Sequence, residues 1–323
     1  MYVIGIDGGG SKTIAVLADK HGTVIAKETV GPTNPNSVGK EEASIRMAGL
    51  LSSIKGKHPL QYNQVAALFA GIAGASSPVN KKNLTEAFQP ILPRNCLLTV
   101  DHDAVIALYS GTFGHPGAVH ISGTGSISYG IDDEWDSHRV GGWGYLIGDE
   151  GSGYSIGKAG LHAALQAHDS ITTGTSLLEK IKQHFQVAHL PEVIPLVYTQ
   201  EARQTIAQLA KIVIEAVDEN DPVAHKIIQT EANKLSIQLA ALVNKMTINT
   251  NRLLPVILTG GVMQRADLFE AAIRCYMKQH VTTPVQVTKV ALPPVAGAVI
   301  GAFKHAHISF HEKSFADRFN QSF

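Results

Sequence analysis

The chain has 323 residues, 44% of them hydrophobic, and its 27 Lys and Arg residues balance its 27 Asp and Glu residues. A chain of this length can bury one large core or two ordinary ones, and the usual domain size favours two domains. Because neither sign of charge is in excess, no broad positive surface is expected for a polyanion. Nucleic acid is therefore not expected as a partner.

The sequence does not resemble that of a secreted or membrane protein. It opens Met-Tyr-Val-Ile-Gly-Ile-Asp, which reaches an acidic residue too soon for a signal peptide, and no apolar run is long enough to span a membrane. Two cysteines, Cys96 and Cys275, cannot build a disulfide framework or a four-thiolate metal site within one chain. We expect a soluble cytoplasmic protein without membrane contacts, and a homodimer is the default assembly.

The first 27 residues predict strand, tight turn, strand, turn and strand, with β-rich runs at 2–6, 14–18 and 23–27. The same order returns with runs at 118–121 and 127–131 around the turn Ser122–Ser126. A repeated unit indicates two related halves. We therefore predict an N-terminal domain over 1–113 and a C-terminal domain with helical insertions over 114–323.

The segments between and after these units mix helices with strands. Helical spacing of apolar residues predicts a helix near 45–54, and β-rich runs predict strands at 65–69 and 96–100. From Gly153 the chain becomes mainly helical, with long periodic stretches at 201–217 and 222–246. A strand at 256–258, a helix through 268–273, a strand near 285–290 and a closing helix after Pro293 complete an α/β fold.

The two repeated turns are rich in glycine, which lets backbone N–H groups approach an anion closely. The first turn reads Asp7-Gly8-Gly9-Gly10-Ser11-Lys12-Thr13, and the second is Ser122–Ser126. One such turn is also common as a plain connection, but two with hydroxyl residues are suited to clasp a polyphosphate from two sides. A third pair, Gly260-Gly261, follows a strand where the sugar or base of a nucleotide would pass. Neither a P-loop nor a Rossmann fingerprint is present.

These motifs, together with several others, resemble those of the BadF/BadG/BcrA/BcrD ATPase family, and specifically its N-acetylglucosamine kinases within the actin-like ATPase superfamily. The matching motifs follow the family's order over nearly the whole chain: Asp7–Thr13, Thr33-Asn34, Asp103-Ala104, Ser122–Ser126, Gly141-Gly142-Trp143-Gly144, Gly148–Ser152, Gly260-Gly261 and Gly297-Ala298. The Gly-Gly-Trp-Gly and Gly-Asp-Glu-Gly-Ser pair is the most specific element, because other members of the superfamily lack it.

The resemblance implies two ribonuclease-H-like (actin-like ATPase) domains around a nucleotide and sugar cleft, with ATP and Mg²⁺ as cofactors and a small amino sugar as the partner molecule. It assigns nucleotide contacts to Gly9, Gly10, Ser11, Lys12, Thr13, Gly123, Thr124, Gly125, Gly260 and Gly261. It assigns the sugar pocket to Asn34, Asp103, Ser126, Gly142, Trp143, Gly144 and Asp149. Ser11 stands where the family more often has Thr, and the hydroxyl is kept.

Phosphoryl transfer to an alcohol also needs a group that takes the hydroxyl proton. Asp103 and Asp101 both follow the β-run at 96–100, and alternation along an extended segment would place both carboxylates on one face. The residues alone leave the two equal, and the resemblance favours Asp103 as the catalytic base because Ala follows it. Asp7 is suited to hold Mg²⁺ through water, with capping of the turn as the alternative.

Three residues of the 141–152 segment have both a functional and a structural interpretation. Asp149 is suited to accept two sugar hydroxyls, whereas capping of the helix that follows is the alternative for Asp149 and Glu150. Trp143 between glycines is expected to present its indole to a sugar ring, with core filling as the alternative.

The predicted reaction is phosphorylation of N-acetylglucosamine to N-acetylglucosamine 6-phosphate, with glucosamine and N-acetylmuramic acid as alternative substrates. The family's other activity is an ATP-driven activator of a 2-hydroxyacyl-CoA dehydratase, which shares an iron–sulfur cluster between two subunits. Neither Cys96 nor Cys275 lies near a glycine turn, which argues against the activator. A catalytically silent sugar sensor is the third hypothesis, and the intact Asp103 argues against it.

Overall fold

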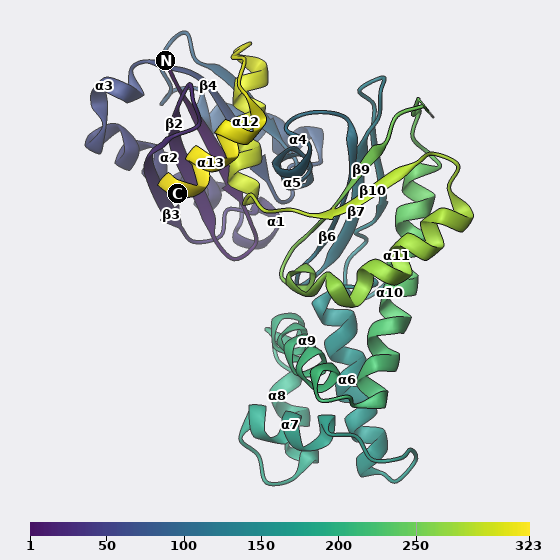
Figure 1. Ribbon diagram of the computed structural model, residues 1–323. Coiled ribbons are helices and arrows are strands. Elements are labelled where there is room, and N and C mark those ends of the chain that lie inside the picture. Colours follow the sequence, from purple (N-terminus) through teal and green to yellow (C-terminus); the bar gives the residue numbers. More distant parts are fainter. Residues whose placement is uncertain (250) are drawn as a thin grey trace. The chain divides into compact units, whose positions relative to one another are not determined.

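The computed structural model describes residues 1–249 and 251–323, which divide into two compact units (Figure 1). Unit 1 comprises Met1–His115 and Val290–Phe323, and unit 2 comprises Pro116–Lys289. The boundary predicted near 113 thus lies close to the end of the first segment of unit 1. The predicted C-terminal domain, 114–323, differs from unit 2, because the last 34 residues, 290–323, pack with unit 1.

A five-stranded sheet of order β3-β2-β1-β4-β5 forms the centre of unit 1. Its strands are β1 (Tyr2–Gly8), β2 (Thr13–Asp19), β3 (Val24–Val30), β4 (Val65–Ile72) and β5 (Leu97–Asp101). β1 to β3 form an antiparallel meander, whereas β4 and β5 continue the sheet in parallel from β1. The carboxyl ends of β1, β4 and β5 therefore lie at one edge of the sheet.

Seven helices of the described residues pack around the unit 1 sheet, and the last two of these belong to the C-terminal segment 290–323. They are α1 (Pro35–Val38), α2 (Lys40–Lys57), α3 (Pro59–Tyr62), α4 (Pro78–Phe88), α5 (Asp103–Thr112), α12 (Pro294–His305) and α13 (Glu312–Ser322). α12 packs on α5 and β1, and a Cβ at Gly297 would lie 1.8 Å from the Ile106 carbonyl oxygen. This backbone contact explains why 290–323 belongs to unit 1.

The sheet of unit 2 repeats the topology of unit 1, with order β10-β9-β6-β7-β8. Its strands are β6 (Gly117–Ser122), β7 (Ser126–Ile131), β8 (Ser137–Gly141), β9 (Leu254–Thr259) and β10 (Val285–Lys289). As in unit 1, three antiparallel strands are followed by two parallel ones on the other side of the first strand. The predicted internal repeat is confirmed.

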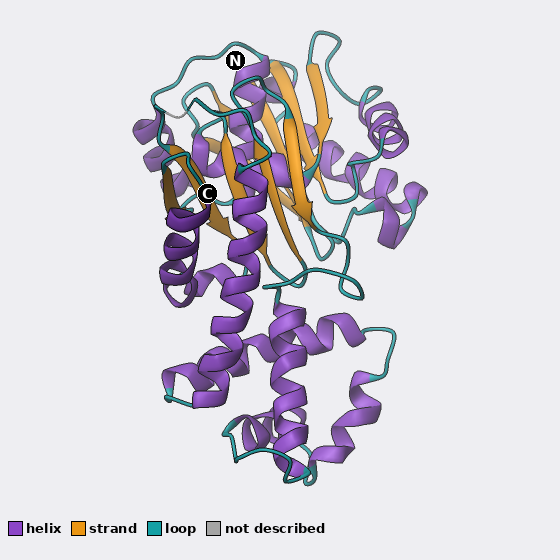
Figure 2. Ribbon diagram, turned by 90° about the vertical axis from the view of Figure 1, so that its right-hand side faces the viewer, coloured by secondary structure: helices purple, strands orange, loops and turns teal. Residues whose placement is uncertain are grey.

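Unit 2 also contains a helical part without strands, between β8 and β9 in sequence (Figure 2). The helices of unit 2 are α6 (Gly153–His168), α7 (Leu177–Phe185), η1 (Leu190–Val193), α8 (Ile194–Val197), α9 (Ala202–Asp218), α10 (Pro222–Val243), η2 (Val262–Arg265) and α11 (Asp267–His280). Asp221 caps α10 by accepting from the backbone N–H groups of Val223 and Ala224, as Asp-Pro predicts. Within the described residues, no helix combines the length and apolar character needed to cross a bilayer.

The strands and helices predicted from apolar spacing are confirmed, including the long stretches that form α9 and α10. β8 was not predicted. Its sequence, Ser137-His138-Arg139-Val140-Gly141, holds one β-branched residue, so nothing local indicates a strand. It forms because β7 offers an edge with which it pairs from Ile131↔Ser137 to Ile127↔Gly141.

Candidate functional site

The first glycine turn joins β1 to β2 in unit 1 and is fixed by backbone hydrogen bonds. Gly9 N–H donates to the Lys12 carbonyl at 3.0 Å and closes the hairpin. Gly10, Ser11 and Lys12 are exposed, so their backbone groups and the Ser11 hydroxyl are open to a ligand. The Thr13 hydroxyl is buried against the hydroxyl of Thr33 at 2.7 Å, so it does not face solvent as a phosphate contact would.

Two carboxylates lie close to this turn at the ends of parallel strands. Asp7 is the second-to-last residue of β1, and Asp103 is the first residue of α5, which follows β5. The pKa of Asp7 is raised to about 7, mainly by burial; the neighbouring Asp103 carboxylate contributes to the rise, and Lys12 opposes it. The structure therefore brings the predicted magnesium ligand and the predicted base into one electrostatic neighbourhood.

Asp101 differs from Asp103 in its partners. Its carboxylate lies 2.8 Å from Lys81 of α4 and accepts from the backbone N–H of His102. The expected alternation of 101 and 103 along one extended face is wrong, because β5 ends at Asp101 and His102 caps α5 by accepting from Ala104 N–H at 3.2 Å. Asp103 instead lies in the first helical turn, 3.0 Å from the His102 ring.

Asn34 caps the short helix α1 beside the first turn. Its side-chain oxygen accepts from Asn36 N–H at 2.9 Å, and this oxygen lies against Gly74, where a Cβ would be only 2.5 Å away. The preceding Thr33 is tied to the turn by its N–H, which donates to the Gly9 carbonyl. The chain thus places the predicted sugar ligand Asn34 next to the predicted phosphate turn.

The second glycine turn joins β6 to β7 in unit 2 and is docked on the start of α6. Gly123 N–H donates to the Gly125 carbonyl, and the Gly123 carbonyl accepts from Gly153 N–H at 2.8 Å. The Thr124 side chain is exposed, as a phosphate ligand would be. The Ser126 side chain is buried and donates to the Glu150 carbonyl at 2.7 Å, so its hydroxyl supports the neighbouring loop.

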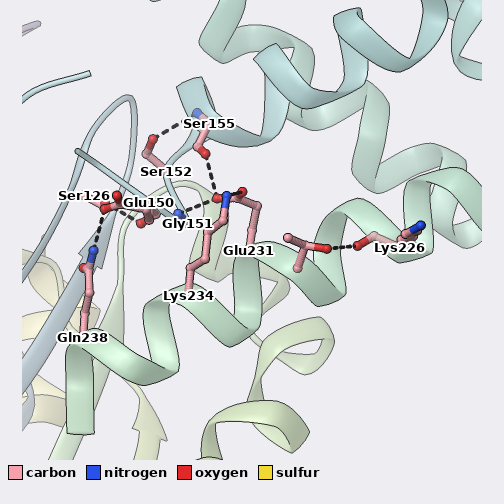
Figure 3. Close-up of polar contacts among 10 residues, drawn as sticks. Ser126, Glu150, Gly151, Ser152, Ser155, Lys226, Glu231, Lys234 and Gln238 are labelled. Carbon is pink, nitrogen blue, oxygen red and sulfur yellow. Dashed lines mark hydrogen bonds and ion pairs between the residues drawn. The ribbon is translucent and has the colours of Figure 1, made fainter. Parts of the chain in front are cut away.

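Hydrogen bonds hold the loop segment Glu150-Gly151 from two sides (Figure 3). We call this set of hydrogen bonds the 150–151 clamp. On one side the Ser126 and Ser122 hydroxyls donate to the carbonyls of Glu150 and Gly151, the latter at 2.6 Å. On the other side the Glu231 carboxylate of α10 accepts from Gly151 N–H at 2.7 Å. The strand ends of the second turn are therefore joined rigidly to the loop that carries Asp149.

α10 contributes more than one residue to the clamp. Glu231 also accepts from the Ser155 hydroxyl and pairs with Lys234, and Gln238 donates to the Glu150 carboxylate at 2.6 Å (Figure 3). Glu231 and Gln238 are two helical turns apart and so share one face of α10. Glu150 thus does not cap α6. The cap is Ser152, which accepts from Ser155 N–H.

Asp149 lies at the base of the Gly-Gly-Trp-Gly loop, with its side chain 5% exposed. It has a left-handed backbone (φ 61°), accepts from Gly144 N–H at 3.1 Å and lies 3.6 Å from Arg203. Burial raises the pKa of Asp149, while the Gly144 hydrogen bond and the Arg203 charge lower it. The carboxylate therefore fixes the loop above it.

The Gly-Gly-Trp-Gly motif presents its indole to solvent. Trp143 is 66% exposed, and the Arg139 guanidinium stands over its ring at 4.1 Å. Gly142 has φ 69°, and a Cβ there would lie 2.9 Å from Ile127, so the bend beside the indole requires glycine. The exposed indole predicted from the flanking glycines is what the structure contains.

Gly260 and Gly261 follow β9 at the same sheet edge as the second turn. Gly260 has φ 103°, and a Cβ would lie 2.3 Å from the Ser122 carbonyl oxygen. Only glycine therefore lets the β9 end pass the β6 end. Gly261 is exposed, with no atom within 4 Å of its Cβ position, which leaves room for a ligand.

The potential metal ligands fit a largely hydrated ion. Across residues 1–249 and 251–323, no three His, Cys, Asp or Glu side chains gather as metal ligands would. A cluster or an all-protein cage has no donors here, whereas Mg²⁺ is commonly held by one or two carboxylates, water and phosphates. Asp7, a hard oxygen donor beside the exposed turn, fits that arrangement.

Two residues of this region were not predicted, Arg203 and Glu231. Arg203 is the second residue of α9 and reaches Gly125 and Asp149, and Glu231 lies on α10. Neither belongs to a motif, and more than 50 residues separate Arg203 from Asp149 and Glu231 from Gly151. The one available signal was Glu231 itself, an acid within the apolar periodicity of a long helix.

The chain is similar to known proteins of one family along most of its length. The sequence pattern of the BadF/BadG/BcrA/BcrD ATPase family matches residues 4–304. The chain is 32% identical to an N-acetylmuramic acid/N-acetylglucosamine kinase of Clostridium acetobutylicum, over 93% of this chain and 97% of that protein. It is 31% identical to an N-acetyl-D-glucosamine kinase of Dictyostelium discoideum, over 82% and 86%. A solved structure from Chromobacterium violaceum matches with TM-score 0.72 at 23% identity, over 93% of this chain and 98% of that chain.

Proposed function

Because the chain belongs to the BadF/BadG/BcrA/BcrD ATPase family and has the two-domain fold of actin-like ATPases, we propose that it phosphorylates N-acetylglucosamine on its 6-hydroxyl with ATP. Curated relatives covering most of the chain are amino-sugar kinases. The single observation in the structure that carries the proposal is the pair Asp7 and Asp103 beside an exposed glycine turn.

The reaction breaks the bond between the γ-phosphorus and its bridging oxygen and forms a bond between that phosphorus and the sugar oxygen. ADP leaves with the electron pair of the broken bond, and the hydroxyl proton moves to a base. The protein must therefore hold the two reactants in line, neutralise phosphate charge and accept one proton.

Asp103 is the proposed base. Its rival, Asp101, already forms an ion pair with Lys81 and accepts from the His102 N–H, so its carboxylate is engaged in structural contacts. Asp103 lies at the start of α5, at the edge of the sheet to which the first turn belongs. Asn34, beside the turn, is the proposed sugar contact in unit 1, through the amide N–H₂ that its helix cap does not use.

Asp7 is proposed to hold Mg²⁺ through water beside the phosphates of ATP. When bound, the ion supplies positive charge to the phosphate oxygens. Asp7 binds a cation only in its ionised form, so its high pKa makes it a weak ligand below neutral pH. Lys12 is exposed in the same turn and provides a second positive charge.

The proposed unit 2 contacts are Thr124 with the phosphates, Gly261 with the adenosine, and Trp143 and Asp149 with the sugar. The exposure of Thr124, Gly261 and Trp143 supports these roles. Asp149 is buried under its loop, so its contact with a sugar hydroxyl requires the 143–148 loop to move. Ser126 supports the 150–151 clamp and accepts, rather than donates, any further hydrogen bond.

Release of ADP tests the function directly. Purified protein with Mg²⁺ and ATP is assayed in a coupled reaction against glucose, glucosamine, N-acetylglucosamine and N-acetylmuramic acid. We expect the highest kcat/KM for N-acetylglucosamine. Comparable rates on plain glucose would overturn the amino-sugar assignment, and preference for the muramic sugar or for glucosamine would select one of the alternative substrates. Equal rates with and without EDTA would show that the reaction does not require Mg²⁺.

The two cysteines do not support the alternative function, an ATP-driven activator that carries an iron–sulfur cluster. Cys96 is buried in unit 1, and its burial raises the pKa of the thiol to about 11, which opposes the thiolate that a cluster needs. Cys275 is exposed on α11 of unit 2. A cluster shared between two subunits needs two thiolates from each chain, and the buried thiol of Cys96 is not suited to supply one.

A further inference from the structure

A guanidinium stands over the second glycine turn. An ideal Cβ built on Gly125 would lie 2.6 Å from a terminal nitrogen of Arg203 and 2.6 Å from a carboxylate oxygen of Asp149. A side chain at position 125 would therefore displace this pair of charges. The absence of a Cβ brings the guanidinium next to the backbone of the proposed phosphate turn and to the loop of the proposed sugar pocket.

The hydrogen-bonding capacity of Arg203 is largely unused. Its side chain is 44% exposed, and its carboxylate partner Asp149 lies 3.6 Å away, which is longer than a hydrogen bond. The guanidinium also faces the Tyr145 ring at 5.5 Å. Within residues 1–249 and 251–323, the structure gives Arg203 these two contacts and no hydrogen bond. Five N–H donors in a planar fork thus remain available for an anion.

Arg203 also supplies a positive charge, which the second glycine turn itself lacks. The first turn contains its own cation, Lys12, but Gly123, Thr124 and Gly125 contain none. Arg203 comes from the first turn of α9, and the helix positions its stem while leaving the head group partly in water. A half-exposed arginine beside a glycine turn has the chemistry of a phosphate ligand.

We propose that Arg203 binds the transferred phosphoryl group and stabilises its charge during transfer. This inference rests on the kinase function proposed above and adds a residue that the motifs do not contain. It introduces no new bond-making step. When the phosphoryl group arrives, the guanidinium exchanges its loose contact with Asp149 for phosphate oxygens, and Asp149 is released to accept sugar hydroxyls. Arg203 would thereby couple the arrival of phosphate to the availability of Asp149.

The alternative role for Arg203 is purely structural, as a counter-charge that keeps Asp149 ionised. The two roles predict different kinetics. A counter-charge for Asp149 acts on sugar binding, so its loss raises the Kd for the sugar and leaves kcat nearly unchanged. A phosphoryl ligand acts in the transition state, so its loss lowers kcat while the Kd for the sugar changes little.

The test uses Arg203→Gln, Arg203→Lys and Arg203→Ala in the full chain, with steady-state kinetics and calorimetric titration of the sugar. We expect Arg203→Gln to lower kcat at least about 100-fold, as removal of a phosphoryl-binding arginine does. The Kd for N-acetylglucosamine should stay within about threefold. Lysine should restore only part of the rate, because a point charge cannot replace the fork. Millimolar guanidinium should raise the rate of Arg203→Ala at least about tenfold, by supplying the missing group.

Lys211→Gln is the matched control, since it removes one exposed positive charge from the same helix about 12 Å further along its axis. It should retain the wild-type kcat. A kcat of Arg203→Gln within threefold of wild type would overturn the inference, as would a loss confined to the Kd for the sugar. Absence of guanidinium rescue in folded Arg203→Ala would do so as well. If the wild-type chain itself does not turn over any of the four sugars, the proposed function fails rather than the role of Arg203.

Discussion

The two glycine turns occupy equivalent places in sheets of the same topology, yet their surroundings differ. In unit 1 the closing pair is Gly8↔Thr13, and the residue before it on the first strand is Asp7. In unit 2 the closing pair is Ser122↔Ser126, and the preceding residue is Ile121. The first turn is thus bordered by a carboxylate, whereas the second is bordered by two serines that hold a loop.

The fifth strands differ in the same way. β5 ends in Asp101 and leads through His102 to Asp103, whereas β10 ends in Lys289. Two of the carboxylates proposed for proton and metal chemistry, Asp7 and Asp103, therefore lie at strand ends of unit 1. In unit 2 the serines that close the second turn, Ser122 and Ser126, instead donate to the 150–151 segment next to Asp149. Under the proposed function the two units carry different roles: unit 1 contains the proposed base and metal ligand, and unit 2 holds the loop proposed to receive the sugar.

The largest expected effect comes from removing the proposed base of unit 1. Asp103→Asn should lower kcat at least about 100-fold and leave the Kd for the sugar within a few fold, because the amide cannot accept the proton. Asp101→Asn is the control and should have a much smaller effect, since its carboxylate pairs with Lys81. ADP release and calorimetry measure both variants. If Asp101→Asn is the crippled enzyme, the assignment of the base is wrong.

The next effect concerns the loop of unit 2. Asp149→Asn should raise the KM for the sugar about 30-fold, the cost of about 2 kcal/mol for a hydrogen bond to a charged group, and leave the KM for ATP within about twofold. Asp133→Asn, in the same unit but bonded to Arg252 and Asn249, should leave both constants unchanged. A larger rise in the KM for ATP than in that for the sugar would contradict the proposed role.

A smaller effect is expected from the clamp itself. Glu231→Gln weakens the hold on Gly151 and Ser155 and should lower kcat/KM for the sugar about tenfold. A residue that only stabilises the fold would lower the amount of active enzyme but not the KM of the folded fraction, so active-site titration separates the two roles. Lys234→Gln removes the half-exposed ion-pair partner of the buried Glu231 and keeps its hydrogen bonds to Gly151 and Ser155, so it should have a smaller effect than Glu231→Gln. An unchanged KM for the sugar in Glu231→Gln would show that the 150–151 clamp does not contribute to the sugar site.

The last prediction concerns stability instead of activity, and it follows from the pKa of Asp7, raised from 3.8 to about 7. Between these pH values the folded protein keeps a proton that the unfolded chain has lost. The stability contributed by this proton is therefore complete below pH 3.8 and is lost as the pH rises through 7. Ligand-free Asp7→Asn cannot lose a proton, so it should exceed wild type in stability by a few kcal/mol at pH 8, since one pKa unit corresponds to about 1.4 kcal/mol.

Melting temperatures of ligand-free wild type and Asp7→Asn at pH 5 and pH 8 check this expectation. The stability difference should be smaller at pH 5 than at pH 8, and the variant should bind Mg²⁺-ATP more weakly. Asp19→Asn is the control, because Asp19 lies in a β-turn of the same sheet where it accepts from the backbone N–H groups of His21 and Thr23. An Asp7→Asn variant less stable than wild type at pH 8 would show that burial does not destabilise the ionised carboxylate of Asp7.

Local sequence determined the strands, the turns and the repeat. Alternating and β-rich runs gave β1, β2, β6 and β7, because strand formation next to a tight glycine turn depends on neighbouring residues. The same turns predicted phosphate contacts at exposed Ser11 and Thr124. The exposed indole of Trp143 was also predicted, since the glycines beside it are adjacent in sequence.

Only the tertiary structure determined which residues from distant parts of the sequence contact these motifs. Asp101 and Asp103 are two residues apart, and they differ because Lys81 arrives from α4 and pairs with one of them. The Thr13 hydroxyl is used by Thr33, and the last 34 residues return to unit 1 because Gly297 lets α12 approach α5. Arg203 and Glu231 reach their partners across long sequence separations. Such pairings depend on how helices pack, which local patterns of apolar and polar residues do not encode.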